Sequence, residues 1–197
     1  MNKDIRWGVP SDGHTFPIYA GPADDMDRVA EFADERGVTH IRFGGDVWKL
    51  ETAEVSGSGV GGDGDGDAGG KVEGLTAQTG TGEWTAVGND ESFKKSDRYT
   101  VKADRHVIEI VAESSKNFVL DIDGQKAGQF TSNNRGLRNL HVEFEGPGEK
   151  LPIDVQIFVS WVARRCMEIR MVSSVWAWTL LMLLFIPFAV MYWIGLI

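Results

Sequence analysis

The chain has 197 residues with 20 Lys and Arg against 29 Asp and Glu, a net charge of −9 at pH 7 and a sequence pI near 4.9. This acidic balance argues against a nucleic-acid partner, because nucleic-acid-binding domains carry a broad basic footprint. The single cysteine, Cys166, excludes an intramolecular disulfide framework and fits a reducing compartment.

The N-terminal segment, residues 1–55, predicts a small βαββ unit. Residues 15–20 are expected to be extended, and residues 22–36 have the pattern of a helix with acidic residues in its first turn. The apolar positions recur at i, i+3, i+4 and i+7, the spacing of a half-buried helix, at Met26, Val29, Ala30 and Ala33. Two strands are expected to follow, at residues 38–43 and 47–55.

Residues 56–82 are expected to form a linker or long loop. The first part, SGSGVGGDGDGDAGG, consists almost entirely of Gly, Asp and Ser, and such a segment cannot bury apolar surface. The low-complexity composition continues to Gly82, with Gly, Asp and Ser less frequent than in the first part. The segment therefore predicts a flexible, solvated connection.

Three aspartates in this linker have the alternating spacing of the first ligands of a calcium-binding EF-hand loop. They are Asp63, Asp65 and Asp67. The rest of the motif is missing, because Ala68 stands where the loop needs glycine and Gly74 where it needs a bidentate glutamate. We therefore expect solvated charge here and no metal site.

After the linker, residues 83–150 predict an antiparallel β-meander. Its expected strands are residues 99–102, 106–112, 117–121, 126–131 and 139–145. The pair Asp123-Gly124 is a strong signal for a tight hairpin. Val142 and Phe144 alternate with polar residues, which indicates a sheet with one buried face.

An apolar helix is expected over residues 151–171. Pro152 suits the first position of a helix. One face of the helix is apolar, at Ile153, Ile157, Trp161 and Val162. The predicted fold class is therefore α+β, with a curved antiparallel sheet packed on this helix.

The last segment, residues 172–197, predicts a transmembrane helix. It has no charged residue, and its length of about 26 residues exceeds the roughly 20 that a bilayer core requires. Aromatic residues stand near both of its ends, as expected at the two headgroup levels, at Trp176, Trp178, Tyr192 and Trp193. The alternative is a buried helix of a soluble domain.

Basic residues before this segment predict the orientation of the chain. Arg164, Arg165 and Arg170 lie just before the expected span and would sit at the membrane interface. By the positive-inside rule they place the N-terminal domain in the cytoplasm of a single-pass membrane protein. The first residues contain no apolar run, so no secretory signal peptide is expected.

Residues 117–130, NFVLDIDGQKAGQF, followed by a strand and an apolar helix, resemble the bacterial tubby C-terminal-like domains, which are related to phospholipid scramblases. The resemblance covers roughly residues 84–170. It implies a twelve-stranded β-barrel or curved sheet around a central helix at residues 153–162, with Gly128 at a close approach. The N-terminal strands would have to complete such a barrel. No ligand-binding residue of these families matches a position here.

No motif for catalysis, a cofactor or a metal is present, so we expect a protein that is not an enzyme. Cys166 has neighbouring arginines but no identified base, which favours a structural cysteine over a nucleophile or a lipid-attachment site. Five basic residues on loops are candidates for contact with lipid phosphates, and ordinary solvated charge is the alternative. These are Lys94, Lys95, Arg98, Arg135 and Arg138.

The sequence leaves two functions open. The first is a C-terminally membrane-anchored, non-enzymatic module that binds lipid headgroups or a protein at the membrane surface. The second is a small accessory subunit of a membrane complex that uses its transmembrane helix as the contact. The expected partners are therefore the bilayer, anionic lipids or other membrane-protein subunits.

Overall fold

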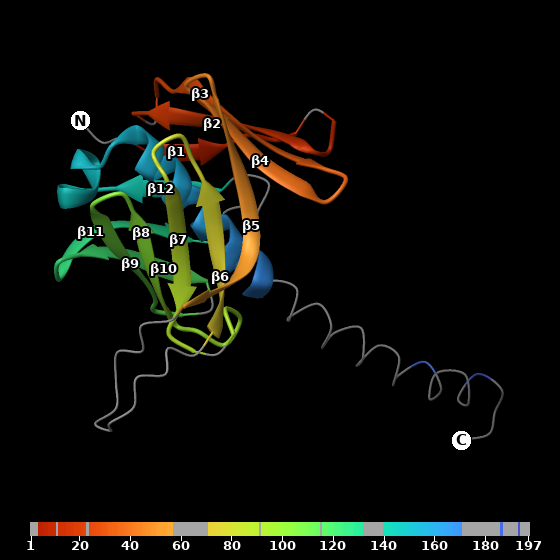
Figure 1. Ribbon diagram of the computed structural model, residues 1–197, viewed down its shortest axis with the longest axis vertical. Helices are drawn as coiled ribbons and strands as arrows, with labels where there is room; N and C mark the ends of the chain where they lie inside the picture. The colour runs from red at the N-terminus through yellow and green to blue at the C-terminus, as the bar shows by residue number, and fades with distance from the viewer. Residues whose placement is uncertain are drawn as a thin grey trace.

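Twelve strands form one closed antiparallel barrel in the described part of the chain (Figure 1). The computed structural model describes residues 4–10, 12–22, 24–56, 71–90, 92–114, 116–131 and 140–170, together with Ile186 and Trp193; for residues 55, 56, 71 and 72 it describes the backbone alone. The strands are β1 (Asp4–Trp7), β2 (Thr15–Gly21), β3 (Asp27–Glu35), β4 (Val38–Phe43), β5 (Asp46–Ser56), β6 (Lys71–Gln78), β7 (Glu83–Gly88), β8 (Arg98–Ala103), β9 (His106–Ala112), β10 (Asn117–Ile122), β11 (Gln125–Thr131) and β12 (His141–Phe144).

Each strand pairs with the next one along the chain, and the first pairs with the last. The closing seam between β1 and β12 aligns Ile5 with Val142 and Arg6 with His141. Beside this seam, His141 Nε2 lies 2.9 Å from Asp4 Oδ2. Closure leaves no exposed sheet edge, which is how a barrel avoids edge-to-edge aggregation.

The two ends of the barrel differ in the length of their connections. The connections after even-numbered strands are short turns, such as Asp123-Gly124, where both residues have the positive φ of a type I′ turn, at 53° and 76°. The odd-numbered strands end at the opposite end of the barrel, and the longest connections in the sequence follow four of them, at residues 8–14, 57–70, 89–97 and 132–140. We call this the long-loop end.

A helix over residues 153–170 fills the barrel and is enclosed behind β5 and β6 in the view of Figure 1. It follows the short 3-10 helix η2 (Gly146–Lys150) at the turn end. Its side chains are buried on every face, as expected for a helix surrounded by a sheet. The fully buried members include Val155, Ile157, Phe158, Val159, Val162, Ala163 and Cys166. The helix therefore serves as the core of the barrel.

Aromatic rings join the helix to the strands. Trp84 of β7 packs edge-on against Phe158 of the helix, with 5.5 Å between ring centroids, and against Trp48 of β5 at 5.3 Å. On the other side, Trp7 of β1 donates from Nε1 to Ser160 Oγ at 3.0 Å. Large rings with satisfied polar atoms fix the rotation of the helix inside the barrel.

A close backbone approach fixes the entry of the helix. A Cβ at Gly148 would lie 1.9 Å from the carbonyl oxygen of Ala127, so only glycine fits there. Gln156 Nε2 donates to the Gly148 carbonyl oxygen at 3.0 Å. Gly128 lies at a second close approach, as predicted, because its Cβ would lie 2.3 Å from the carbonyl oxygen of Glu143.

The predicted α+β class is wrong: the described chain is a β-barrel with one internal helix. The described residues of the expected βαββ unit include no α-helix, because β3 replaces the helix predicted over residues 22–36. Ala30 and Phe32 face the core in β3, and hydrogen bonds to both β2 and β4 outweigh the weak β-propensity of its acidic residues. Strands β1, β6 and β7 were not predicted, and β6 occupies part of the expected linker.

The predicted membrane span, residues 172–197, lies outside the described residues apart from Ile186 and Trp193. In the described part of the chain, no helix is long and apolar enough to cross a membrane. We therefore correct the prediction of a single-pass membrane protein with a cytoplasmic N-terminal domain, which rests on that span.

Candidate functional site

A pocket of about 500 Å³ opens between the last turns of the helix and strands β2 to β5. The helix contributes Trp161, Arg164, Arg165 and Glu168 to its lining. Apolar side chains of the strands contribute Phe16, Phe32 and Leu50. The volume lies within the usual range for a site that binds a small molecule.

Arginine and glutamate side chains enter the helix where it reaches the long-loop end. Cys166 and Met167 still face the core, whereas Arg164, Arg165 and Glu168 turn toward the pocket. Positions i and i+4 lie on the same face of a helix, so Arg164 and Glu168 meet there. The pocket thus has a charged floor at the end of an apolar core.

Arg164 is 7% exposed and stacks on three aromatic rings. Its Cζ lies 4.1 Å from the ring centroid of Phe16, 4.8 Å from that of Trp7 and 5.7 Å from that of Phe32. Burial lowers the pKa of Arg164 from its ordinary value, and the Glu168 carboxylate opposes that shift. A flat guanidinium suits this stacking better than an ammonium does.

The carboxylate of Glu168 is shared by two arginines. Arg164 Nε donates to Glu168 Oε1 at 3.0 Å, and Arg165 Nη1 donates to Glu168 Oε2 at 2.6 Å. The side chain of Arg165 is 37% exposed, so part of its guanidinium faces the pocket and solvent. Two positive charges against one negative charge leave this floor with an excess of one positive charge.

The β3 side of the pocket carries an acidic side chain, Asp34. Asp34 stands two positions after Phe32 near the end of β3; it is exposed and lines the pocket. Among the described residues, its carboxylate has no ion-pair partner. Glu51 also borders the pocket, but its carboxylate lies 2.5 Å from Lys49 Nζ, on the side of β5 opposite to the buried Leu50.

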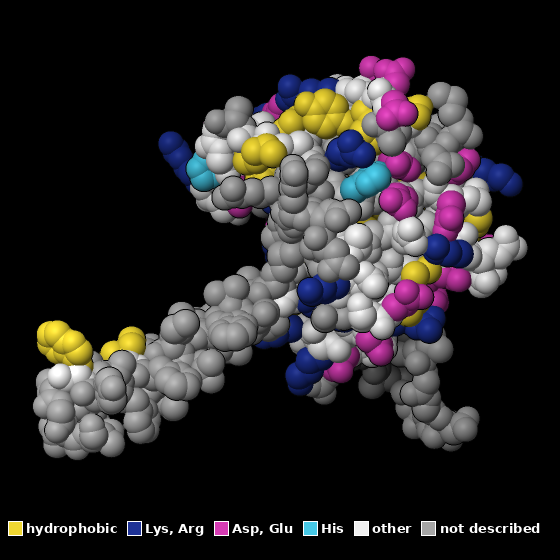
Figure 2. All heavy atoms as spheres, turned by 180° about the vertical axis from the view of Figure 1, so that it is seen from behind, with side chains coloured by type: hydrophobic (Ala, Val, Ile, Leu, Met, Phe, Trp, Pro, Cys, Tyr) yellow, Lys and Arg dark blue, Asp and Glu magenta, His cyan; other side chains and the backbone are white. Residues whose placement is uncertain are grey.

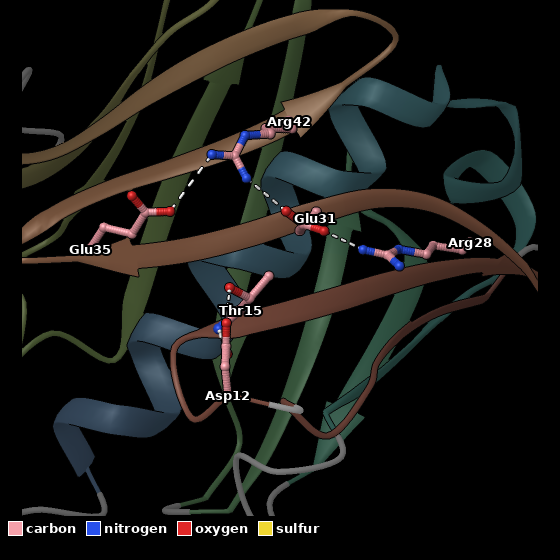
Figure 3. A network of polar contacts seen from close by, with 6 residues as sticks. All are labelled: Asp12, Thr15, Arg28, Glu31, Glu35 and Arg42. Carbon is pink, nitrogen blue, oxygen red and sulfur yellow. Dashed lines mark hydrogen bonds and ion pairs between the residues drawn. The ribbon is translucent and has the colours of Figure 1, made fainter.

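The connection between β1 and β2 forms the rim of the pocket and is held by Asp12 (Figure 3). The Asp12 carboxylate accepts hydrogen bonds from the Thr15 hydroxyl at 2.7 Å and from the backbone N–H groups of His14 and Thr15 at 2.9 and 2.6 Å. These bonds lower the pKa of Asp12 from 3.8 to about 2. The turn presents Gly13 and His14 to the pocket.

The outer face of β3 and β4 carries a separate chain of ion pairs (Figure 3). Glu31 is paired with Arg28 and with Arg42, whose Nη1 lies 2.7 Å from Glu31 Oε1. Arg42 also lies 3.7 Å from Glu35. Acidic and basic side chains are interspersed on the barrel face in Figure 2, so this face shows no field of one sign.

The structure separates the basic residues predicted to contact lipid phosphates. Lys94 and Lys95 are exposed on the connection between β7 and β8, at the long-loop end. Arg98 begins β8 and forms an ion pair with Glu109. None of these three lines the pocket. Arg135 and Arg138 lie outside the described residues.

The three arginines predicted at a membrane interface lie at the mouth of the barrel. Arg164 and Arg165 line the pocket. Arg170 donates from Nη2 to the carbonyl oxygen of Ser96 at 2.7 Å, and its Cζ lies 5.2 Å from the ring centroid of Phe118. Of the aromatic residues predicted at the interface, Trp176, Trp178 and Tyr192 lie outside the described residues, and Trp193 is 90% exposed.

Cys166 is fully buried within the helix. Burial raises the pKa of its thiol well above the ordinary value, which disfavours the nucleophilic thiolate. Over the residues that the structure describes, no group of three His, Cys, Asp or Glu side chains could hold a metal ion.

Sequence reasoning missed Phe16, Phe32 and Asp34. They lie on strands β2 and β3, and the segment containing β3 resembled a helix. Their partners on the helix come more than a hundred positions later, so no local spacing motif could connect them.

No family model, no curated protein and no solved structure matches this chain. The fold is nevertheless compatible with the tubby-like architecture, since twelve strands enclose an apolar helix and the N-terminal strands complete the barrel.

Proposed function

We propose that the chain is a non-enzymatic, tubby-like barrel module that binds the phosphate-bearing headgroup of a phospholipid in the pocket at its long-loop end. The observation that carries this proposal is the charged floor of that pocket, where Arg164 and Arg165 share the single carboxylate of Glu168. Guanidinium groups bind phosphate oxygens with paired hydrogen bonds, and Arg165 is partly exposed.

The surroundings of the pocket support a binding role. Binding residues are commonly mounted on loops held by a rigid scaffold, and the pocket opens at the end of the barrel where the odd-numbered strands end. Lys94 and Lys95 project from one of these connections. Near an anionic lipid surface, each would contribute on the order of 1 kcal/mol.

The barrel offers no comparable support for catalysis. Cys166 is buried within the core. Both carboxylate oxygens of Glu168 are held in ion pairs with Arg164 and Arg165. Recognition without chemistry is therefore the function that we assign to the pocket.

The proposal is tested by titrating the full-length chain with dihexanoyl phosphatidylserine, a soluble short-chain phospholipid, and measuring heat and tryptophan fluorescence. We expect saturable binding that Arg165→Gln weakens by roughly tenfold or more, because it removes a charge-assisted contact. The matched control, Arg42→Gln, removes an arginine from the outer face and should bind as the wild type does. Wild-type protein that binds no short-chain phosphatidylserine, phosphatidylethanolamine or phosphatidylglycerol would overturn the proposal.

A further inference from the structure

The two sides of the pocket carry opposite charges. Arg164, Arg165 and Glu168 give the helical side an excess of one positive charge, while Asp34 gives the β3 side one negative charge. Glu51 also lines the pocket, but its negative charge is offset by its ion pair with Lys49. A dipolar pocket favours a ligand whose own charges are arranged in the opposite sense.

The positive side can still bind an anion. Arg165 gives one N–H to Glu168, and a guanidinium has five N–H donors. Arg164 is less suited to direct contact, because its guanidinium is stacked on Phe16, Trp7 and Phe32. Its charge nevertheless adds to the field that an anion beside Arg165 would experience, and burial strengthens that field.

The negative side can bind a cation. Asp34 is exposed near the end of β3 and lines the pocket together with Phe32, two positions before it. A carboxylate without a partner among the described residues, close to the aromatic Phe32, suits an ammonium group.

We infer that this pocket selects a zwitterionic ligand that carries a phosphate and an ammonium group a few bonds apart, with the phosphate on Arg165 and the ammonium on Asp34. Phosphoethanolamine has this chemistry, either free or as the headgroup of a phospholipid. This inference rests on the proposed function for the site and goes further by naming the class of headgroup.

The test compares four soluble probes by calorimetric titration of the full-length chain: phosphoethanolamine, inorganic phosphate, ethanolamine and dihexanoyl phosphatidylethanolamine. We expect phosphoethanolamine to bind at least roughly tenfold more tightly than phosphate or ethanolamine, because it makes both charged contacts. Asp34→Asn should remove this preference without weakening the binding of phosphate. Arg165→Gln should weaken the binding of phosphoethanolamine and of phosphate. Glu35→Gln, a matched change on the outer face of β3, should alter neither.

The outcomes separate the inference from the proposed function. Short-chain phospholipids that bind while phosphoethanolamine binds no better than phosphate would overturn the inference and leave headgroup binding intact. Free phosphoethanolamine that binds as tightly as the lipid would support the inference and identify a soluble ligand in place of a lipid. If none of the four probes binds, the inference is overturned. If the short-chain phosphatidylserine and phosphatidylglycerol also fail to bind, the proposal of headgroup binding is overturned as well.

Discussion

At the scale of single residues, Arg164 links the stability of the barrel to its pocket. Its guanidinium connects the helix to β1, β2 and β3 through three rings, and its ion pair with Glu168 shapes the pocket floor. A charge as buried as this one is retained only when it is paired and stacked. The same side chain therefore stabilises the fold and prepares the site.

Replacing Arg164 with Met should lower the free energy of unfolding by about 2–3 kcal/mol, because the stacking and one side of a buried ion pair are lost. The free energy of unfolding of Arg164→Lys should lie between those of the wild type and Arg164→Met, since an ammonium keeps the charge but not the flat stacking surface. Urea denaturation measures both effects. Arg165→Gln is the control and should cost less than about 1 kcal/mol because Arg165 is partly exposed. Equal losses of unfolding free energy in Arg164→Met and Arg165→Gln would contradict the special role of Arg164.

Asp12 should make the stability of the rim depend on pH. Its pKa is lowered in the folded protein, so its contribution is fully present above the unfolded value of 3.8 and is lost as the pH falls toward about 2. The difference in melting temperature between wild type and Asp12→Ala should therefore shrink across that interval. A difference that stays constant from neutral to acidic pH would show that the carboxylate charge does not hold the loop.

At the scale of elements, sequence patterns located strands best where apolar and polar residues alternate. Residues 38–43 and 106–112 were predicted with the bounds that β4 and β9 have. The helix near residues 153–170 was recognised from its apolar character. Strand β3 was mistaken for a helix because Val29, Ala30 and Ala33 also fit a helical stripe, and only its pairing with two neighbouring strands decides the matter.

The connection between β5 and β6 gives a prediction at this scale. Ser56 of β5 is aligned with Lys71 of β6, so residues 57–70 join two paired antiparallel strands. Replacing these residues with Asn-Gly, which forms a tight hairpin turn, should preserve the barrel and change the stability by less than about 2 kcal/mol.

A matched shortening of the connection between β7 and β8 should be destabilising, because it removes the buried Phe93 and Ser96. Thermal melting followed by circular dichroism compares the two deletions. A large loss of stability on removing residues 57–70 would mean that this connection contributes to the fold beyond closing a hairpin.

At the scale of the whole molecule, barrel closure brings together residues that are far apart in the sequence. The β1–β12 seam pairs residue 5 with residue 142, and the pocket joins β2 to β5 with the end of the helix. The tubby-like resemblance supplied the idea of a barrel around a helix, but residue spacing alone could not bring Asp34 and Arg165 into one pocket. Sequence reasoning therefore selected exposed lysines on a connection and missed the pocket.

The most direct test of the headgroup-binding account is a crystal structure of the full-length chain with dihexanoyl phosphatidylethanolamine. We expect the phosphate within hydrogen-bonding distance of the Arg165 guanidinium and the ammonium within the same reach of the Asp34 carboxylate. Arg164 should remain stacked on Phe16, Trp7 and Phe32. A headgroup bound elsewhere on the barrel, with this pocket holding none, would contradict the account.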